Sequence, residues 1–452
     1  MKRYTKRGWM LAALLVLAAL TTPRGSEAFC GFYVASGDAK IFNRASKVVL
    51  ARDGDRTVIT MCSDFQGDPK EFAVVVPVPV VPEKSQVHIG DMAWVDHVDA
   101  YTAPRLVEYH DPNPCPTKEI VVQGEQKIAI RRKDSSTRQV TSAALRSLRI
   151  EAQYKVDEYE IVILSATEAQ ALEEWLRRNG YRIPEKATPV LRSYIKQKMF
   201  FFVAKVNVEE QLRRGITYLR PIQVAFESPR FMLPIRLGMA NAQGPQEMFV
   251  FTLTRRGRVE ATNYRTVRMP TGMEVPEFVK ERFSDFYVRL FARQHARERE
   301  EAVFLEHVWV VTPNTPSCDP CVSPFLTPAE LRSLGAFWVG VPPKPPGEVV
   351  VTRLHLRYDG RHFPEDLVLQ ETGDRENWQA RYVIRHPYRG DAECPELAAY
   401  RKSVWERREK EAKNYCDLTG SDLDGTKRMM GVLANWSEPD EALHWWERIW
   451  AR

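Results

Sequence analysis

The sequence lacks the features that mark several large classes of protein. No apolar segment reaches the roughly 20 residues that a transmembrane helix needs, since the N-terminal run, residues 9–20, has only 12. There is no HExxH, GxSxG, P-loop or dinucleotide-binding glycine pattern. The net charge of +6 is small for 452 residues, and charged stretches such as residues 293–301 mix both signs. These absences argue against a membrane bundle and a nucleic-acid-binding protein, and they leave no recognised catalytic motif.

The N-terminus has the pattern of a secretory signal peptide. Basic residues precede the apolar run, and Ser26 and Ala28 place small residues at the positions that signal peptidase reads. We therefore predict cleavage after Ala28 and export to the periplasm or the extracellular space. Cleavage would remove five basic residues and one acidic residue, which leaves a nearly neutral chain of charge +2. The alternative is a signal anchor that stays attached.

Strands and helices follow one another along the rest of the chain in an order typical of an α+β fold. Residues 48–62 predict a hairpin around a glycine turn, and residues 160–184 predict a strand followed by a helix. Residues 71–82 are rich in valine, but Pro77 and Pro79 remove two N–H donors on one side, which predicts an edge strand. We expect mostly antiparallel sheets with covering helices, cross-linked by disulfides.

Several helix boundaries can be predicted from local signals. Ser165 with Glu168 and Thr327 with Glu330 match the capping box, and Gly335 suits the end of the second of these helices. Further helices are expected at residues 92–101, from about residue 276 to near residue 298, at 397–415 and at 438–450.

The length allows two or three domains at roughly 100 to 200 residues each. We place a signal peptide at residues 1–28, a β-rich α+β region at residues 29–272, and a C-terminal α+β region with a helical tail at residues 273–452. A single undivided domain over both regions is the alternative.

All seven cysteines follow the predicted cleavage site: Cys30, Cys62, Cys115, Cys318, Cys321, Cys394 and Cys416. An exported protein meets an oxidising compartment, so most of them should be paired. Because seven is odd, at least one thiol is free or is bonded to another chain. Cys30 is predicted to carry no lipid, because its preceding residues do not fit a lipoprotein signal.

The cysteine spacing leaves several pairings open. In the loop-entropy account a bond from Cys318 to Cys321 contributes only about 2 kcal/mol, whereas one from Cys115 to Cys394 reaches roughly 5 to 6 kcal/mol. Cys318 and Cys321 could bond to each other or separately to Cys115 and Cys394. Two further pairings are geometrically feasible: Cys394 with Cys416, and Cys30 with Cys62.

The Cys318–Cys321 pair also has the spacing of a redox dithiol, with Cys318 as nucleophile and Cys321 as resolving residue. Six residues separate Cys321 from Pro328, so the pair does not lie on the first turn of the following helix, where the helix dipole would stabilise a thiolate. The structural interpretation is therefore favoured. Zinc would need two more ligands, and His295 and His307 are isolated, so no metal or cofactor is expected.

Several words of the sequence, taken together, resemble the bacterial "domain of unknown function 2330" family. They occur in order along nearly all of the chain after the signal peptide and include CGFYVA (30–35), DGDRTVITM (53–61), QGDPKEFAVVVPVP (66–79), YTAPRLVEY (101–109), NGYRIP (179–184), SPRFMLPIRLGMAN (228–241), GRVEATNYRTV (257–267) and CDPC (318–321). The resemblance implies an exported protein with a signal peptide, and it brings no catalytic residues with it.

These observations lead to one hypothesis and one rival. We expect a non-catalytic exported scaffold or binding protein, stabilised by disulfides, that binds an envelope protein or ligand. The rival is a thiol–disulfide oxidoreductase that uses Cys318 and Cys321. The last predicted helix carries an apolar stripe that we expect to dock on the body; a membrane-surface role is disfavoured by its acidic residues. The stripe consists of Leu443, Trp446, Ile449 and Trp450.

Overall fold

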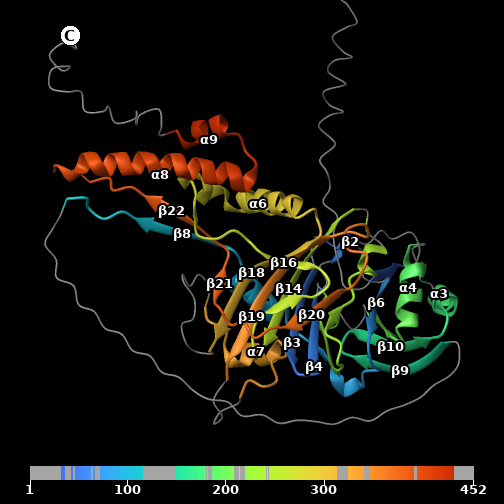
Figure 1. Cartoon of the computed structure of the whole chain (residues 1–452). Coiled ribbons are helices and arrows are strands. Elements are labelled where there is room, and N and C mark those ends of the chain that lie inside the picture. Colours follow the sequence, from blue (N-terminus) through green and yellow to red (C-terminus); the bar gives the residue numbers. More distant parts are fainter. Residues whose placement is uncertain are drawn as a thin grey trace, which may run out of the picture.

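The structure is a computed structural model of the chain (Figure 1). It describes residues 32–35, 42–43, 46–62, 65–66, 72–115, 148–179, 181, 186–207, 213, 219–240, 242, 244–312, 324–340, 347–390 and 394–431. The predicted cleavage site at Ala28 and the predicted last helix at residues 438–450 lie outside these residues, so both stay predictions.

The largest sheet has nine strands in the described part of the chain. In spatial order, eight of them are β16 (Arg265–Arg268), β18 (Ala302–Val311), β19 (Val349–Tyr358), β14 (Gln246–Thr254), β3 (Ser46–Asp53), β4 (Arg56–Cys62), β12 (Ile222–Glu227) and β7 (Val87–Ile89), and β21 (Trp378–Gln379) pairs with β18. The predicted hairpin at residues 48–62 is confirmed as β3 and β4. Strands from both sides of residue 272 share this sheet, and the division of the chain at that residue stays a prediction.

A second sheet of five described strands lies against the first. Its strands, all antiparallel, are β1 (Phe32–Ala35), β6 (Phe72–Val78), β11 (Phe200–Val206), β10 (Tyr159–Ala166) and β9 (Leu148–Val156). Its outer face is covered by α3 (Ala169–Arg178) and α4 (Ala187–Lys196), as Figure 1 shows.

Apolar side chains of β6 enter two different cores, which explains its continuous run of valines. Val74 and Val76 belong to the core between the two sheets, whereas Ala73 and Val75 belong to the core under α3 and α4. Successive side chains of a strand point to opposite faces, so a strand buried on both faces needs apolar residues at every position.

The prediction that residues 71–82 form an edge strand is wrong, because β6 lies between β1 and β11. The prolines still limit the pairing. The ladder with β1 ends at Val75, before Pro77, while the ladder with β11 continues through Pro77 to Val78. A short partner strand therefore avoids the positions where the N–H donors are missing.

The two predicted capping boxes had different outcomes. For α3 the prediction is wrong: the helix begins at Ala169 with Glu168 as N-cap and no side-chain cap bond, since Ser165 is still part of β10 and its hydroxyl donates to Glu151 at 2.5 Å. For α7 (Pro328–Ser333) the box between Thr327 and Glu330 is confirmed.

Gly335 ends the turn after α7 as predicted. Its φ of +98° lies in the left-handed region, and a Cβ atom there would come within 2.7 Å of the Val58 side chain. Both the backbone conformation and the packing against the largest sheet therefore require glycine at this position.

The outer face of the largest sheet is covered by α7 and α2 (Met92–Thr102). Val95, Val98 and Tyr101 of α2 pack with Val49 and Ala51 of β3 in a single buried cluster. The predicted helix at residues 92–101 is thereby confirmed, and its apolar stripe is core.

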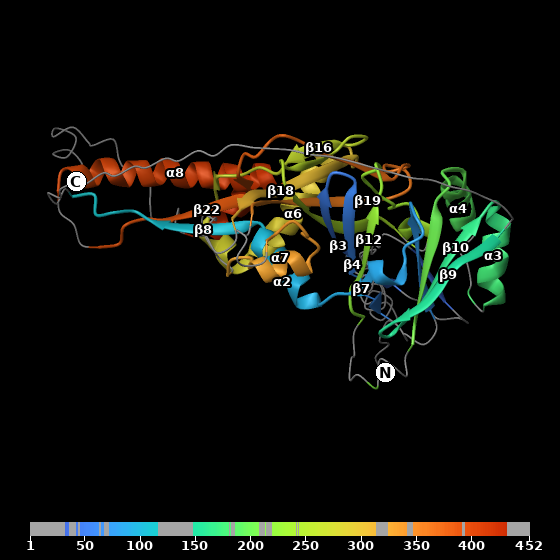
Figure 2. The ribbon, with the colours of Figure 1, turned by 90° about the horizontal axis from the view of Figure 1, so that it is seen from below.

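A three-stranded parallel sheet and several helices extend from one end of this body. The strands are β17 (Met273–Glu274), β22 (Arg381–His386) and β8 (Arg105–His110), and the helices are η4 (Glu277–Arg282), α6 (Phe283–Arg297), α8 (Glu396–Thr419) and α9 (Leu423–Met430). We call the part formed by β8, β22 and α8 the arm; Figures 1 and 2 show that it projects beyond the body. The predicted helix at residues 397–415 is confirmed as part of α8.

The remaining described elements are short. They are β13 (Met232–Leu233), β20 (Leu367–Glu371) and β15 (Val259–Ala261), which form one sheet, β2 (Phe42–Asn43) paired with β5 (Phe65–Gln66), and the 3-10 helices η2 (Lys84–Gln86) and η3 (Gly238–Ala240). The α+β class with mostly antiparallel sheets and covering helices is confirmed. Among the helices that the structure describes, none is long and apolar enough to cross a membrane.

Candidate functional site

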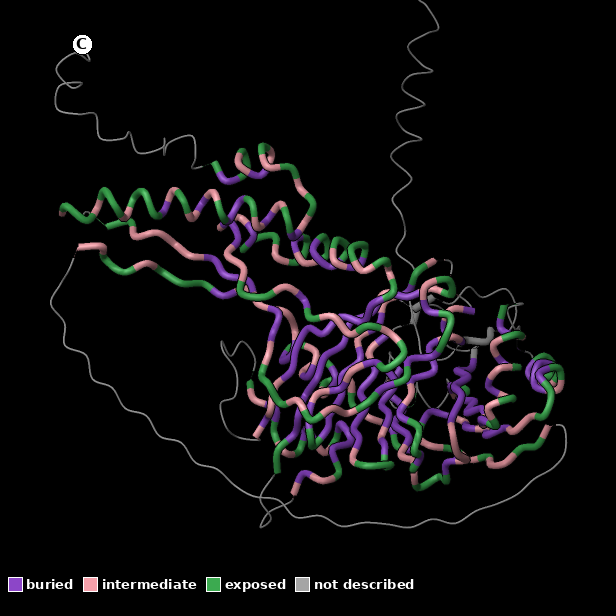
Figure 3. Tube along the Cα trace, viewed as in Figure 1, coloured by how far each residue is buried: buried purple, intermediate pink, exposed green. Residues whose placement is uncertain are grey.

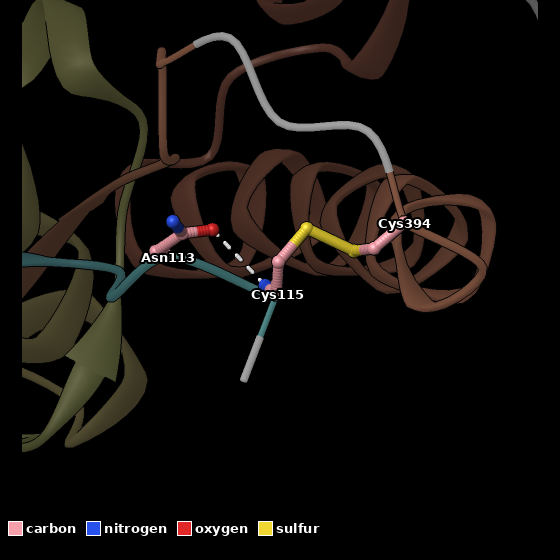
Figure 4. Close-up of a disulfide and its surroundings, with 3 residues drawn as sticks. All are labelled: Asn113, Cys115 and Cys394. Carbon is pink, nitrogen blue, oxygen red and sulfur yellow. Dashed lines mark hydrogen bonds between the residues drawn. A yellow bond between two sulfur atoms is a disulfide. The ribbon is translucent and has the colours of Figure 1, made fainter. Parts of the chain in front are cut away.

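The arm ends in a disulfide bond between Cys115 and Cys394 (Figure 4). The two residues are 279 positions apart in the sequence, and their Cα atoms are 5.9 Å apart. Cys115 follows β8, and its backbone N–H donates to Oδ1 of Asn113 at 3.0 Å. Cys394 lies two residues before the first residue of α8. The predicted disulfide cross-linking is therefore confirmed, and the bond connects strand β8 to the beginning of α8.

Two other cysteines have free thiols. The proposed pairing of Cys394 with Cys416 is wrong, because Cys394 is bonded to Cys115 and the continuous helix α8 separates it from Cys416 by about 33 Å. The Cys416 thiol donates instead to Oγ1 of Thr426 at 3.3 Å. Cys62 is buried in the core, and burial raises the pKa of its thiol far above the usual range, so it is a poor nucleophile.

The other sequence-predicted cysteines, Cys30, Cys318 and Cys321, lie outside the described residues. The redox dithiol therefore stays a prediction. The proposed pairing of Cys30 with Cys62 is wrong, because the thiol of Cys62 is free. Among the described residues no group of three or more His, Cys, Asp or Glu side chains is arranged to hold a metal ion.

A buried carboxylate lies on β18, next to the edge strand β16 of the largest sheet. Glu306 of β18 has 0% of its surface exposed, and the register between β18 and β19 shifts at this residue, which makes it the extra residue of a β-bulge. Its oxygens accept hydrogen bonds from Nδ1 of His355 at 2.6 Å, from Nε of Arg353 at 2.6 Å and from the hydroxyl of Tyr287 at 2.5 Å. The bulge thus directs the carboxylate toward β19 and α6.

The contacts continue from Arg353 toward α2 and β3. Its guanidinium donates to the carboxylate of Asp99 and lies 4.5 Å from the ring centroid of Phe249. Asp99 in turn is 2.8 Å from Nζ of Lys47, which also donates to Asp96 at 2.9 Å. Burial lowers the pKa of Arg353, but Glu306 and Asp99 outweigh it, so the pKa is raised and the side chain is cationic.

On the other side the contacts continue from His355 toward β14. Its Nε2 lies 2.8 Å from Oε1 of Glu247, and Arg357 donates to the same oxygen at 3.1 Å. Since both ring nitrogens of His355 face carboxylates, both carry protons and the ring is an imidazolium. Burial lowers the pKa of this ring, but Glu306 and Glu247 outweigh burial and raise it. The ring stacks on Phe291 of α6, with centroids 3.7 Å apart.

These side chains form one charge network, which we call the Glu306 network. Burial disfavours the ionised form of Glu306, but His355 and Arg353 outweigh it and lower its pKa to about 2. The network contains equal numbers of acidic and basic groups: Asp96, Asp99, Glu247 and Glu306 with Lys47, Arg353, His355 and Arg357. It connects β3, β14, β18, β19 and α2.

The sequence reasoning missed this network. A signal was present, because two adjacent ionisable residues, Glu306 and His307, interrupt the apolar run of residues 302–311. Three clefts occur in the described part of the structure, with volumes of about 470, 440 and 760 Å³, and none of them is lined by a residue of the network. The arrangement is therefore suited to holding strands and helices together and not to contacting a substrate.

His307 lies beside the network and is not part of it. Its exposed fraction is 0%, and neither ring nitrogen has a hydrogen-bond partner among the described residues. The ring contacts Tyr101 edge-on at 5.8 Å and Trp309 at 6.1 Å between centroids. Burial, reinforced by Arg105 and Arg353, lowers the pKa of His307 to about 3, so the ring is neutral.

Polar contacts surround His386 at the end of β22 in the arm. The ring of His386 lies between two carboxylates, with Nε2 at 2.7 Å from Glu108 and Nδ1 at 3.3 Å from Glu277, and it stacks on His110 at 4.6 Å. Lys280 donates to the same Glu108 carboxylate at 2.9 Å. Figure 3 shows that the end of the arm is mostly exposed or half-buried, whereas its base is buried.

One carboxylate under α8 has an unusual environment. Glu411 is 3% exposed, and burial raises its pKa to about 7. Arg407 and Arg408 act in the opposite direction, while Glu274 and Glu277 add to the increase. The ion-pair contact of its Oε1 with Nε of Arg407 is 3.7 Å long. Near neutral pH this carboxyl group is therefore only partly ionised.

The fold and these sites define a disulfide-linked α+β protein of two packed sheets, with a buried charge network in the body and an arm closed by a disulfide. The chain belongs to a family of uncharacterized proteins conserved in bacteria, DUF2330, whose profile matches residues 24–370. The resemblance seen in the sequence is thus confirmed. No curated protein and no solved structure matches the chain. β21, β22, α8, α9 and Cys394 lie after the matched residues, so the arm joins a family segment to a C-terminal segment.

Proposed function

We propose that this protein is exported and acts in the bacterial envelope as a non-catalytic scaffold or binding protein, in which the disulfide serves the architecture of the arm. The signal-peptide pattern of residues 1–28 supports export. The family, described only as conserved in bacteria, is compatible with this role and brings no catalytic residues.

The observation that carries the proposal is the bond between Cys115 and Cys394 at the end of the arm. Disulfides form and persist in oxidising compartments such as the periplasm. The end of the arm has few buried side chains, so a covalent bond there replaces the packing that a larger core would supply. Because the two cysteines are 279 positions apart, the bond closes a long loop, and the conformational entropy that a disulfide removes from the unfolded chain grows with loop length.

The clefts of the body and the polar surface of the arm support a binding role. The centre of the charge network, formed by Glu306, Arg353 and His355, is buried, whereas the clefts of about 440 to 760 Å³ lie in the size range of small-ligand sites. The arm presents charged and polar side chains on two strands and a long helix. We expect the partner to be an envelope protein or an envelope ligand.

Cell fractionation tests the proposal. We expect the wild-type protein in the periplasm or the medium with Phe29 as its first residue. Leu14→Arg, which places a charge in the apolar run, should leave an uncleaved precursor in the cytosol and is the matched control. A wild-type precursor that stays in the cytosol contradicts export. Turnover of a dithiol substrate by the purified protein, lost in Cys318→Ser, would replace this proposal by the oxidoreductase.

A further inference from the structure

A cleft of about 760 Å³ lies where three segments of the body meet. One wall is formed by Arg297 at the end of α6 and by Arg299 and Glu301 in the turn that follows it. Arg265, the first residue of β16, supplies a second wall, and the loop between β19 and β20 supplies a third with Arg361. Strand β16 is an edge strand of the largest sheet and pairs with the beginning of β18, the strand that follows α6 (Figure 1).

Positive charge predominates among the side chains of this cleft. Four arginines and one histidine line it, against two glutamates. Arg265 is paired with Glu298 at 2.7 Å, and Arg297 is paired with Asp417 at 2.5 Å.

The other two arginines, Arg299 and Arg361, are different. Both are exposed, and within the described residues neither guanidinium takes part in an ion pair or a side-chain hydrogen bond. His362 is already held, with Nδ1 at 3.0 Å from Asp359. The cleft therefore has two guanidinium groups whose donors are available to a ligand.

The backbone around Arg299 is held in an uncommon conformation. Arg299 and Glu300 are consecutive residues with φ angles of +57° and +64°, a region that side-chain-bearing residues rarely adopt. The backbone N–H of Arg299 donates to the carbonyl of Ala296 at 3.2 Å, and that of Glu300 donates to His295 at 2.9 Å. Such conformations concentrate at functional sites. The same N–H groups satisfy carbonyls at the end of α6, which weakens the repulsion that a helix C-terminus exerts on an anion.

We propose that this cleft binds a small ligand with at least two anionic groups, of the phosphate or carboxylate kind, between Arg299 and Arg361. A guanidinium presents parallel N–H donors that match the oxygens of both groups. The cleft volume fits a ligand of small-molecule size. In the cell such groups could come from a soluble phosphorylated compound or from an anionic lipid headgroup; the chemistry of recognition is the same. The inference does not depend on where the protein resides.

The test is isothermal titration calorimetry of the purified full chain with tripolyphosphate. We expect saturable binding that weakens as salt rises, because the contact is between charges. Arg299→Gln combined with Arg361→Gln should weaken binding by about tenfold or more, the loss expected for charged hydrogen bonds. Arg289→Gln, an exposed arginine of α6 that does not line the cleft, is the matched control and should bind as the wild type does.

Flotation with vesicles distinguishes the two sources. Binding to phosphatidylglycerol vesicles that is lost in the double variant, and absent with phosphatidylcholine, supports a lipid headgroup. Binding of tripolyphosphate without vesicle binding supports a soluble ligand. Binding of neither probe overturns the proposal, as does a double variant that binds as tightly as Arg289→Gln. The circular dichroism spectrum of each variant establishes that it is folded.

Discussion

Replacing His307 by phenylalanine should make the protein less sensitive to acid. The ring is fully buried and has no hydrogen-bond partner among the described residues, and its pKa is lowered to about 3. In the unfolded chain a histidine has a pKa of about 6.5. Between these values the unfolded chain binds a proton that the folded protein does not, so the folded protein loses stability as the pH falls. Above pH 6.5 this contribution is fully present.

The magnitude follows from the difference between the two pKa values. A gap of about 3.5 units corresponds to about 5 kcal/mol lost between pH 6.5 and pH 3, or about 3 kcal/mol by pH 4.5. Phenylalanine keeps a flat ring against Tyr101 and Trp309 but has no nitrogen to protonate. It also removes two buried polar atoms that lack partners, which favours the folded state at pH 7.

Urea unfolding followed by tryptophan fluorescence, from pH 4 to pH 8, measures this effect. The free energy of unfolding of His307→Phe minus that of the wild type should be constant above pH 6.5 and should grow by about 1.4 kcal/mol per unit below it. His88→Phe, at an exposed position of β7, is the control and should change the stability by only a few tenths of a kcal/mol. A difference for His307→Phe that does not depend on pH would refute the reasoning.

Three further outcomes are expected. The raised pKa of Glu411, about 7, gives the wild type a stability that is fully present below pH 4.5 and is lost as the pH rises through 7, so the free energy of unfolding of Glu411→Gln in urea should rise by up to about 3 kcal/mol relative to that of the wild type between pH 4.5 and pH 8. A difference between the two proteins that stays the same over this range argues against it. Glu306→Gln should lower the free energy of unfolding at pH 7 by about 3 to 5 kcal/mol, because it removes the buried carboxylate that Arg353 and His355 share and leaves each with one acidic partner; a loss below 1 kcal/mol contradicts this. Cys394→Ser should lower the free energy of unfolding by up to about 5 kcal/mol and should speed hydrogen exchange at the end of the arm. Equal exchange rates in the arms of the variant and the wild type would show that the disulfide has no structural role.

Local signals in the sequence predicted the elements whose residues also fit their tertiary surroundings. The capping box of Thr327 and Glu330 and the glycine at position 335 are both present in the structure. The similar pattern at Ser165 failed because the preceding strand continues past it and its hydroxyl bonds to a neighbouring strand. The prolines of β6 correctly indicated limited pairing but not the number of neighbours, which depends on strands far away in the sequence.

The Glu306 network could not be derived from the sequence for a related reason. Its members come from five segments, and nothing in the local pattern of any one segment requires them to meet. The left-handed pair Arg299 and Glu300 is similar, because neither residue type signals a positive φ. The Cys115–Cys394 bond was one of several pairings that spacing allowed, and only the parallel alignment of β8 with β22 brings these two positions together.

The most direct test of the central claim, that the disulfide serves the architecture of an exported protein, is non-reducing peptide mass mapping of the protein purified from its native cells. Free thiols are blocked with an alkylating reagent at lysis, before digestion. We expect a linked peptide pair that contains Cys115 and Cys394, together with a mature N-terminus at Phe29. Alkylated Cys115 and Cys394 in a chain that still carries residues 1–28 would contradict the account.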